Sequence, residues 1–341
     1  MLNLVSKSMV SPFVGGTPKV PRNLAAGLDR LGVPYVVNKA LDSCEYLWIH
    51  DDYRALLSVR KLDPAIKLIM GPNLFVMPRD IPKKAFIPPN ALYIQPAAWG
   101  AEAWRLAGFD RCPLDHWYVG VDASYLPPPT PRRDADRVVL YYKLRSEAGL
   151  RRIQDILQKR GIRYTLVKYL DYKLEDYIAE LQRSRYVIWY GSHEAQGIAL
   201  QEALAMDRPV LVVDVSTLGD FDNWDIGYEF RPEEQSIPAT SAPYFDDRCG
   251  VKIKSIDELP SAIDRIEANL DAYRPREFFD ETFDLAECAQ RFLDLYPKWF
   301  SGRPPYRERG GELAPFRPRP DWITIGIGIR IDRFRRRFGL R

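Results

Sequence analysis

The chain has few of the residues from which metal centres and disulfide frameworks are built. It contains three histidines and four cysteines in 341 residues, and no two cysteines form a CxxC pair. Neither a zinc site nor a disulfide framework is expected from so sparse a set, and we predict no metal. Because unpaired cysteines are typical of a reducing compartment, we expect a cytoplasmic protein.

Long apolar runs are missing as well. No run approaches the ~20 apolar residues that span a bilayer, and the N-terminus does not have the pattern of a signal peptide. Apolar residues nevertheless make up 46% of the chain and aromatic residues 12%, which is typical of a globular protein and excludes a disordered one. The length is sufficient for two domains.

The charge is unevenly distributed. Residues 303–341 hold eleven Arg and four Asp or Glu, a net charge of +7, so the rest of the chain carries −4 of the total +3. A mildly acidic body gives no reason to expect nucleic acid as a partner, whereas a basic tail indicates contact with something anionic. In residues 322–341, Ile and Phe lie among arginines, which predicts peripheral contact with the inner membrane face or, alternatively, a docking arm.

Short apolar runs alternate with helical segments through most of the chain, which predicts parallel α/β sheets. A proline cluster at residues 126–131 interrupts the alternation and is the best candidate for a domain linker. We predict an N-terminal acceptor-side domain over 1–130, a donor domain over 131–280, a helix within 281–302 that packs back on the first domain, and a tail over 303–341. Strands are predicted at 35–37, 46–49, 66–70, 91–94, 117–119, 137–142, 164–169, 186–190 and 210–213.

The most informative stretch is GSHEAQGIALQEALAMDRPVLVVD, residues 191–214. Its polar start is turn-like, the apolar residues from Ile198 recur at helical spacing, and Pro209 ends that helix before a buried strand. In parallel sheets ligands sit outside the carboxyl ends of strands, where helix N-termini point. We therefore expect Glu194 in the loop and Glu202 in the helix to lie near one crevice, on either side of Gly197.

This stretch resembles the E-x7-E signature of retaining glycosyltransferases with the GT-B fold, family 4 in particular. The match includes Glu194, Gly197, Glu202 and the Pro-Val at 209–210. Two weaker similarities occur in the same order, a Gly-Gly pair before the first helix and a GVD sequence at residues 120–122. The resemblance implies two Rossmann-like βα domains that face a central cleft.

The resemblance also implies roles for individual residues. Glu202 matches the glutamate that accepts hydrogen bonds from the ribose of the nucleotide, and Glu194 matches the one beside the donor sugar, without being assigned as a nucleophile. The backbone N–H groups of Gly197 and Ile198 match those that meet the diphosphate, as expected for a helix N-terminus. Gln196, directly before Gly197, stands where the family usually has Phe. Gly15 and Gly16 match the family's glycine pair in the acceptor or phosphate loop.

A cationic clamp for the leaving phosphate is expected after the first strand of the second domain. The family usually has an Arg there and a Lys five residues later, and this chain has Lys143 and Ala148 at those positions. Arg145 lies two residues after Lys143, so both side chains would face the same side of an extended segment. The prediction is that Lys143 and Arg145 together form the clamp.

His50 is the candidate for handling the acceptor. It ends the predicted strand at 46–49, where it would position or deprotonate the acceptor hydroxyl. The alternative is a histidine whose hydrogen bonds are satisfied at a strand end.

The function implied is metal-independent, retaining transfer of a hexose from a nucleoside diphosphate sugar, such as a UDP- or GDP-sugar, to a glycan or glycolipid in polysaccharide biosynthesis. No cofactor is expected, because the nucleotide sugar is a substrate. Ala148 and Gln196 leave open a non-catalytic relative that binds sugar nucleotides or glycans. An epimerase that releases free UDP and a free sugar is a third possibility. The base, the sugar, the acceptor linkage and the oligomeric state stay open.

Overall fold

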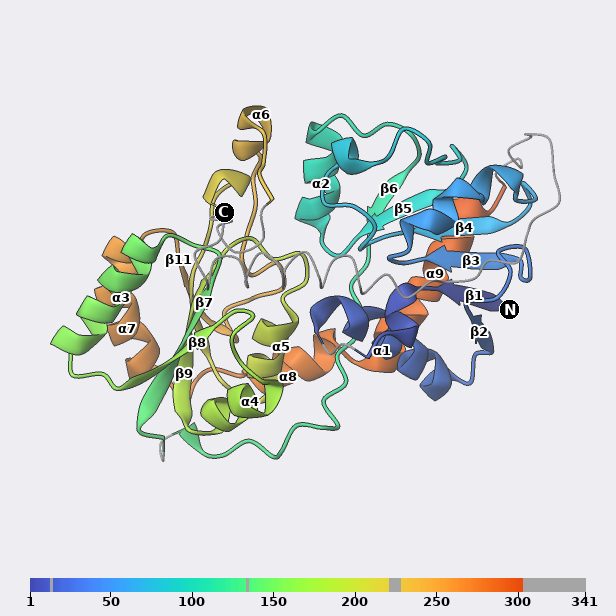
Figure 1. The fold of residues 1–341 in the computed structure, drawn as a ribbon. Coiled ribbons are helices and arrows are strands. Elements are labelled where there is room, and N and C mark those ends of the chain that lie inside the picture. Colours follow the sequence, from blue (N-terminus) through green and yellow to red (C-terminus); the bar gives the residue numbers. More distant parts are fainter. Residues whose placement is uncertain (13–14, 133–134, 221–227, 303–341) are drawn as a thin grey trace. The chain divides into compact units, whose positions relative to one another are not determined.

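The computed structural model describes residues 1–12, 15–132, 135–220 and 228–302, so the predicted tail over 303–341, including residues 322–341, lies outside the described part. The chain divides into two compact units. Unit 1 comprises Met1–Pro96, Ala107–Val119 and the described residues from Ala286 on, and unit 2 comprises Ala97–Leu106 and Gly120–Leu285. Each unit contains one parallel sheet (Figure 1).

The sheet of unit 1 has six strands in the order β2-β1-β3-β4-β5-β6, and every pairing is parallel. The strands are β1 (Leu2–Val5), β2 (Tyr35–Val37), β3 (Tyr46–Ile49), β4 (Lys67–Met70), β5 (Leu92–Gln95) and β6 (Leu114–His116). The sequence pattern missed β1, and it was wrong about a strand at 117–119, because the strand is β6 and ends just before that segment. Polar residues interrupt the apolar run in both β1 (LNLV) and β6 (LDH).

Two long helices belong mainly to unit 1, α1 (Gly16–Leu31) and α9 (Leu285–Phe300). Helix α9 packs on strand β3 through aromatic side chains. The ring of Phe292 lies 5.2 Å from that of Trp48 and 4.9 Å from that of Trp117, and the hydroxyl of Tyr296 donates to the carbonyl of Leu47 at 3.1 Å. The last described helix therefore covers the sheet formed by the start of the chain.

The sheet of unit 2 has five parallel strands in the order β11-β10-β9-β7-β8. The strands are β7 (Arg137–Lys143), β8 (Tyr164–Lys168), β9 (Ser184–Gly191), β10 (Val210–Val213) and β11 (Gly250–Ile253). The first four agree with the predicted strands to within two residues. β11 was missed, since the last strand predicted from the sequence is the one at 210–213.

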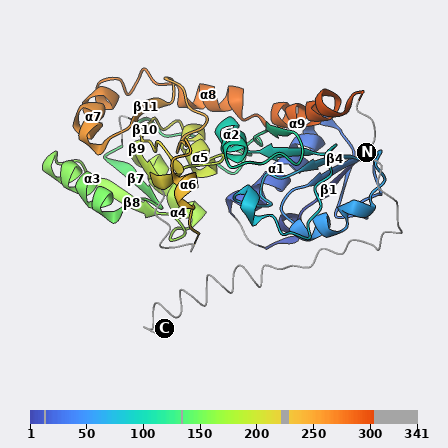
Figure 2. The same cartoon turned by 90° about the horizontal axis from the view of Figure 1, so that it is seen from above.

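Helices cover both faces of this second sheet (Figures 1 and 2). The helices of unit 2 are α2 (Ala98–Leu106), α3 (Glu147–Lys159), α4 (Leu174–Gln182), α5 (Ile198–Ala205), α6 (Pro232–Gln235), α7 (Leu259–Ala268) and α8 (Pro275–Thr282). Helices α3 and α7 bury their apolar sides on one face of the sheet, and α4 and α5 lie on the other. Ser146 caps α3 by accepting a hydrogen bond from the N–H of Gly149 at 3.2 Å. In the described part of the chain no helix is long and apolar enough to cross a membrane.

The proline-rich segment before β7 is held against the end of α5. The buried guanidinium of Arg208 donates to the carbonyl of Thr130 at 2.7 Å and to its hydroxyl at 2.8 Å. Arg132 donates to the carbonyl of Asp207 at 2.7 Å and forms an ion pair with its carboxylate. Residues 130–132 therefore belong structurally to unit 2.

Gly250 allows the edge strand β11 to approach β10 closely. Its φ is +137°, and a Cβ at this position would lie 2.3 Å from the carbonyl oxygen of Val210. Both the backbone conformation and the close approach therefore require glycine.

We expect Gly250→Ala to lower the free energy of unfolding by about 3 kcal/mol or more, because strain at positive φ adds to a backbone overlap that the sheet must relieve. Gly161→Ala is the matched control, since Gly161 has a φ of +66° but open space around its Cβ position. Its cost is about 1–2 kcal/mol from conformation alone. Urea denaturation measures both values, and equal losses would contradict the close approach.

Candidate functional site

Two predicted site residues of unit 2, Lys143 and Glu194, gather with Asp214, which was not predicted, where three adjacent strands end. Lys143 is the last residue of β7, Glu194 lies in the loop after β9, and Asp214 follows β10 directly. These strands are neighbours in the sheet and all run parallel, so their carboxyl ends form one edge. The N-terminus of α5 lies at the same edge, because the loop after β9 leads into it. This is the position at which parallel α/β sheets bind ligands.

Gly197 forms the N-cap of α5 in the left-handed conformation, with φ of 81° and ψ of 51°. A Cβ there would meet its nearest neighbours at 3.6 Å, an ordinary contact, so the conformation and not the space requires glycine. The first intrahelical bond runs from the N–H of Gln201 to the carbonyl of Gly197 at 3.0 Å. The amide groups of the first turn, beginning with Ile198, therefore point out of the helix end, where its dipole favours an anion.

Glu194 forms an ion pair with Lys143 at 2.7 Å between Oε1 and Nζ. The side chains are 10% and 15% exposed, respectively. Burial alone would lower the pKa of Lys143, but the negative charge of Glu194 and the neighbouring Tyr169 reverse this, and the pKa is raised. The ammonium also lies 4.5 Å from the centre of the Tyr169 ring. Lys143 is thus held charged beside the loop that carries Glu194.

The loop of Glu194 is fixed through its main chain. The N–H of Glu194 donates to the carbonyl of Thr240 at 2.9 Å, and the indole of Trp99 donates to the carbonyl of Glu194 at 3.0 Å. Gln196 and Gln201 connect this loop to α5. The side-chain amide of Gln196 donates to Oε1 of Gln201 at 3.1 Å, and the side-chain amide of Gln201 donates to the backbone carbonyl of Gln196 at 3.0 Å. Gln196, which replaces the Phe of the similar family, is therefore a buried loop-fixing residue in this structure.

Asp214 holds the segment on which Glu194 rests, and the sequence did not indicate this role. Its buried carboxylate accepts hydrogen bonds from the hydroxyl of Thr240 at 2.9 Å, the N–H of Ser241 at 2.6 Å and the ammonium of Lys254 at 2.9 Å. Burial would raise the pKa of Asp214, but the N–H of Ser241 and the ammonium of Lys254 outweigh it and the pKa is lowered. The one available signal was an acid directly after a buried strand.

Glu202 lies in the second turn of α5 and is only 2% exposed. Its Oε1 accepts a hydrogen bond from the hydroxyl of Tyr125 at 2.5 Å. The two predicted glutamates therefore lie on either side of the α5 N-terminus as expected, and each has a partner from another segment of unit 2.

Lys143 and Arg145 do not lie together in the way the sequence suggested. Leu144 between them has a φ of +50°, so the segment is not extended, and the reason given for a shared orientation is wrong. Arg145 instead donates to the carbonyls of Gly191 at 3.1 Å and Val213 at 3.2 Å. Its guanidinium is thereby fixed at the ends of β9 and β10, while Lys143 is occupied by Glu194.

His50 is completely buried in unit 1 at the end of β3. Its Nε2 lies 2.9 Å from the amide nitrogen of Asn73, and its Nδ1 lies 3.4 Å from the hydroxyl of Ser6 and 3.5 Å from Asp51. Burial would raise the pKa of Asp51, but His50 and the hydroxyl of Ser8 lower it to about 2. This geometry matches the alternative reading of a histidine with satisfied hydrogen bonds.

Gly15 and Gly16 begin helix α1, Gly15 as its N-cap and Gly16 as its first residue. Gly15 has a φ of 176°, which is ordinary extended backbone, and neither Cβ position has an atom within 4 Å. No contact within the described part of unit 1 requires glycine at either position.

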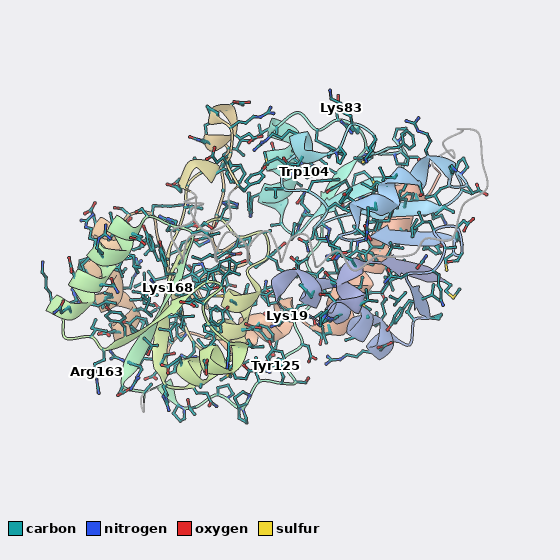
Figure 3. The ribbon with its side chains drawn as sticks, in the orientation of Figure 1. Lys19, Lys83, Trp104, Tyr125, Arg163 and Lys168 are labelled. Atoms are coloured by element: carbon teal, nitrogen blue, oxygen red, sulfur yellow. The ribbon has the colours of Figure 1, made fainter. Side chains whose placement is uncertain are left out.

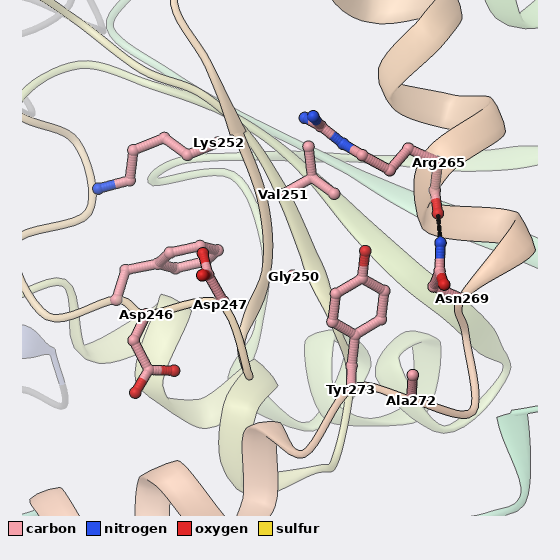
Figure 4. Close-up of a pocket in the computed structure, with 10 residues that line it drawn as sticks. Asp246, Asp247, Gly250, Val251, Lys252, Arg265, Asn269, Ala272 and Tyr273 are labelled. Carbon is pink, nitrogen blue, oxygen red and sulfur yellow. Dashed lines mark hydrogen bonds between the residues drawn. The ribbon is translucent and has the colours of Figure 1, made fainter.

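A groove of about 580 Å³ follows the free edge of β11 (Figure 4). Figure 4 shows Arg265, Asn269 and Tyr273 on one side of the strand and Lys252 with Asp247 on the other. The groove carries charges of both signs, and neither Glu194 nor Glu202 lines it. The residues described by the structure contain no cluster of His, Cys, Asp and Glu that could hold a metal ion.

No family model matches the chain, and no curated protein sequence matches it. Among solved structures it is similar to the apo form of the lipopolysaccharide outer core galactosyltransferase WaaB, at 12% identity and a TM-score of 0.51, over 87% of this chain and 99% of that one. It is also similar to the catalytic domain of Starch Synthase IV from Arabidopsis thaliana bound to ADP and acarbose, at 8% identity and a TM-score of 0.52, over 87% and 98%. The likeness shows the fold, and the predicted architecture of two parallel-sheet α/β domains of the GT-B type is confirmed.

Asp214→Asn tests the support beneath Glu194. We expect a loss of about 2 kcal/mol in the free energy of unfolding at pH 7, because hydrogen bonds to a buried charge are lost or weakened. The folded-state pKa of Asp214 is lowered. Its contribution is therefore complete above the unfolded value of ~3.9 and disappears as the pH falls through the folded value.

Urea denaturation of wild type and Asp214→Asn between pH 7 and pH 2.5 measures this difference. The difference between the two free energies of unfolding should decrease only below about pH 4. Asp264→Asn is the control, since Asp264 pairs with Arg160 on the surface and should matter little at any pH. A difference between Asp214→Asn and wild type that stays constant down to the lowest pH would contradict the assignment.

Proposed function

We propose that the chain is a retaining glycosyltransferase, similar to those of family 4, that takes a hexose from a nucleoside diphosphate sugar. The observation that carries the proposal is the arrangement around α5. Glu194 and Glu202 flank the left-handed Gly197 at its N-terminus, and the ammonium of Lys143 lies 2.7 Å from Glu194. The shared fold with solved glycosyltransferase structures supports it.

In this proposal the nucleotide binds at the N-terminus of α5. The backbone N–H groups of Gly197 and Ile198 bind the diphosphate, since they combine donors with the positive end of the helix dipole. The carboxylate of Glu202 accepts hydrogen bonds from ribose hydroxyls, because an ionised carboxylate offers only acceptors. Gln196 shapes the loop that leads from Glu194 into α5.

The chemical step requires stabilisation of the leaving diphosphate. Negative charge grows on it as the bond to the anomeric carbon breaks, and Lys143, Arg145 and the α5 N-terminus oppose that charge without a metal. Glu194 lies beside the sugar and holds Lys143 in position. The sugar is transferred with retention at the anomeric carbon.

The acceptor in this proposal is a glycan or glycolipid, and the loop of Gly15 and Gly16 in unit 1 takes part in binding it. The two similar structures are named for lipopolysaccharide and starch synthesis, which supports acceptors of this class. His50 is buried, so in this scheme it acts by positioning the side chains of Asn73 and Ser6 that contact its ring. The protein acts in the cytoplasm, with residues 322–341 as its peripheral membrane contact.

A non-catalytic protein that binds sugar nucleotides is the second candidate. One observation favours it. Ala148 stands exposed in the first turn of α3, where the similar family has the second phosphate-binding cation. Such a protein would bind the nucleotide without cleaving the donor.

Nucleotide binding is tested by thermal shift with UDP, GDP, ADP, CMP and dTDP. We expect one of them to stabilise the protein by about 2.7 kcal/mol at about a hundredfold excess over Kd, because it binds only the folded state. Glu202→Ala should reduce the shift markedly, because the ribose loses its acceptor while the diphosphate contacts remain. Glu267→Ala is the matched control, since Glu267 also accepts a tyrosine hydroxyl, that of Tyr186 near the start of β9, away from the site. No shift with any of the five nucleotides would refute the donor site.

Catalysis is tested by slow hydrolysis of the donor without acceptor, followed as release of the nucleoside diphosphate. Lys143→Met should lower this rate about 100-fold, because charge stabilisation of the leaving group is lost. Lys168→Met, at the exposed end of the neighbouring strand β8, should leave it unchanged. Binding without hydrolysis by the wild type, even with glycan acceptors added, would favour the non-catalytic protein.

A further inference from the structure

We propose that Tyr125 belongs to the nucleotide site, where in the free protein its hydroxyl occupies the place on Glu202 that a ribose hydroxyl takes. The nucleotide must then displace Tyr125 to bind. The inference rests on the proposed function, and it adds a residue that lies 77 positions from Glu202 and outside the motif.

The contact itself is short and charge-assisted. The two oxygens are 2.5 Å apart, at the short end of the range of about 2.5–2.7 Å for a hydroxyl bound to a carboxylate. Burial and the charge of Glu202 both raise the pKa of Tyr125, so the phenol keeps its proton and is the donor. A phenol and a ribose hydroxyl both donate an O–H to a carboxylate, so they compete for the same acceptor.

Exposure differs sharply between the two partners. Glu202 is 2% exposed and fixed within α5, whereas Tyr125 is 43% exposed (labelled in Figure 3). A buried carboxylate without a donor is costly, which explains why the free protein keeps a hydroxyl on it. The exposed tyrosine is the partner that can move away into solvent.

Tyr125 comes from a turn, and its departure would leave the helix undisturbed. The turn is closed by a bond from the N–H of Ser124 to Asp122 at 2.9 Å and one from the N–H of Leu126 to the carbonyl of Ala123 at 3.0 Å. Helix α5 is anchored separately, since the hydroxyl of Tyr177 donates to its Ala199 carbonyl at 2.8 Å. Rotation of the Tyr125 side chain removes this donor from Glu202.

Loss of the Tyr125 hydroxyl is expected to raise the affinity for the nucleotide. A nucleotide that replaces the Tyr125 hydroxyl exchanges one hydrogen bond to Glu202 for another and gains little there. Tyr125→Phe removes the competing hydroxyl while it keeps the ring, so the nucleotide no longer has to displace this hydrogen bond from Glu202. The variant should bind the nucleotide about tenfold more tightly, the equivalent of one hydrogen bond to a charged group.

Isothermal titration calorimetry with UDP, GDP and ADP measures the Kd of the wild type and of Tyr125→Phe. The control is Tyr186→Phe, which removes the other tyrosine–glutamate hydrogen bond, 3.1 Å to Glu267, and should leave the Kd unchanged. In a Glu202→Ala background the gain from Tyr125→Phe should disappear, because the two residues act through one contact. Circular dichroism confirms folding of each variant.

A Tyr125→Phe protein that binds equally or more weakly would overturn the inference while wild-type binding leaves the proposed function standing. A gain that persists in the Glu202→Ala background would also overturn it, because the effect would not pass through Glu202. If neither wild type nor Tyr125→Phe binds any of the three nucleotides, both the proposed donor site and the inference are wrong.

Discussion

The parallel direction of every strand in unit 2 is the constraint on which its candidate site depends. Adjacent strands lie about 4.8 Å apart, so residues that follow neighbouring strands come within reach of one another. Lys143, Glu194 and Asp214 follow β7, β9 and β10, and they meet at one edge although they span 72 positions of the chain. An antiparallel neighbour would have placed one of them at the opposite edge. The same edge receives the α5 N-terminus because the β9–α5 loop is short.

Three buried acids at this edge, Asp214, Glu194 and Glu202, accept hydrogen bonds from different kinds of donor. Asp214 takes a main-chain N–H together with hydroxyl and ammonium donors from residues 240–254, which makes it part of the framework. Glu194 and Glu202 take donors from side chains, Lys143 and Tyr125. Side-chain donors can be exchanged for those of a ligand at low cost, whereas a main-chain donor cannot leave without remodelling the loop. The two acids of the motif are thus the exchangeable ones.

What the sequence allowed us to predict was local. The buried run at 210–213, the helix from Ile198 and the break at Gly197 follow from apolar spacing and from a residue that tolerates positive φ. The contacts that give these elements their chemistry are long-range, such as Tyr125 with Glu202 and Asp214 with the segment at 240–241, and no spacing rule indicates them. The strands β1, β6 and β11 were missed because polar residues interrupt them, as in LNLV, LDH and GVKI, whereas predicted strands of similar length such as β2 and β10 are continuous apolar runs. The segment from Lys143 to Arg145 was wrongly predicted to be extended, because the positive φ of Leu144 is visible only in the folded turn.

The charges at this edge also bear on the proposed reaction, in which Ala148 stands where the similar family has a cation. Lys143 is balanced by Glu194, and Lys254 by Asp214. Arg145 is held by carbonyl oxygens, which orient the guanidinium without neutralising it, and within the described residues no carboxylate pairs with it. Its full positive charge therefore remains at the ends of β9 and β10, fixed in place and stacked 4.6 Å from the centre of the Tyr190 ring. If the proposed reaction holds, Arg145 would supply a permanent charge near the phosphates, and the α5 dipole and Lys143 would supply the remaining positive potential.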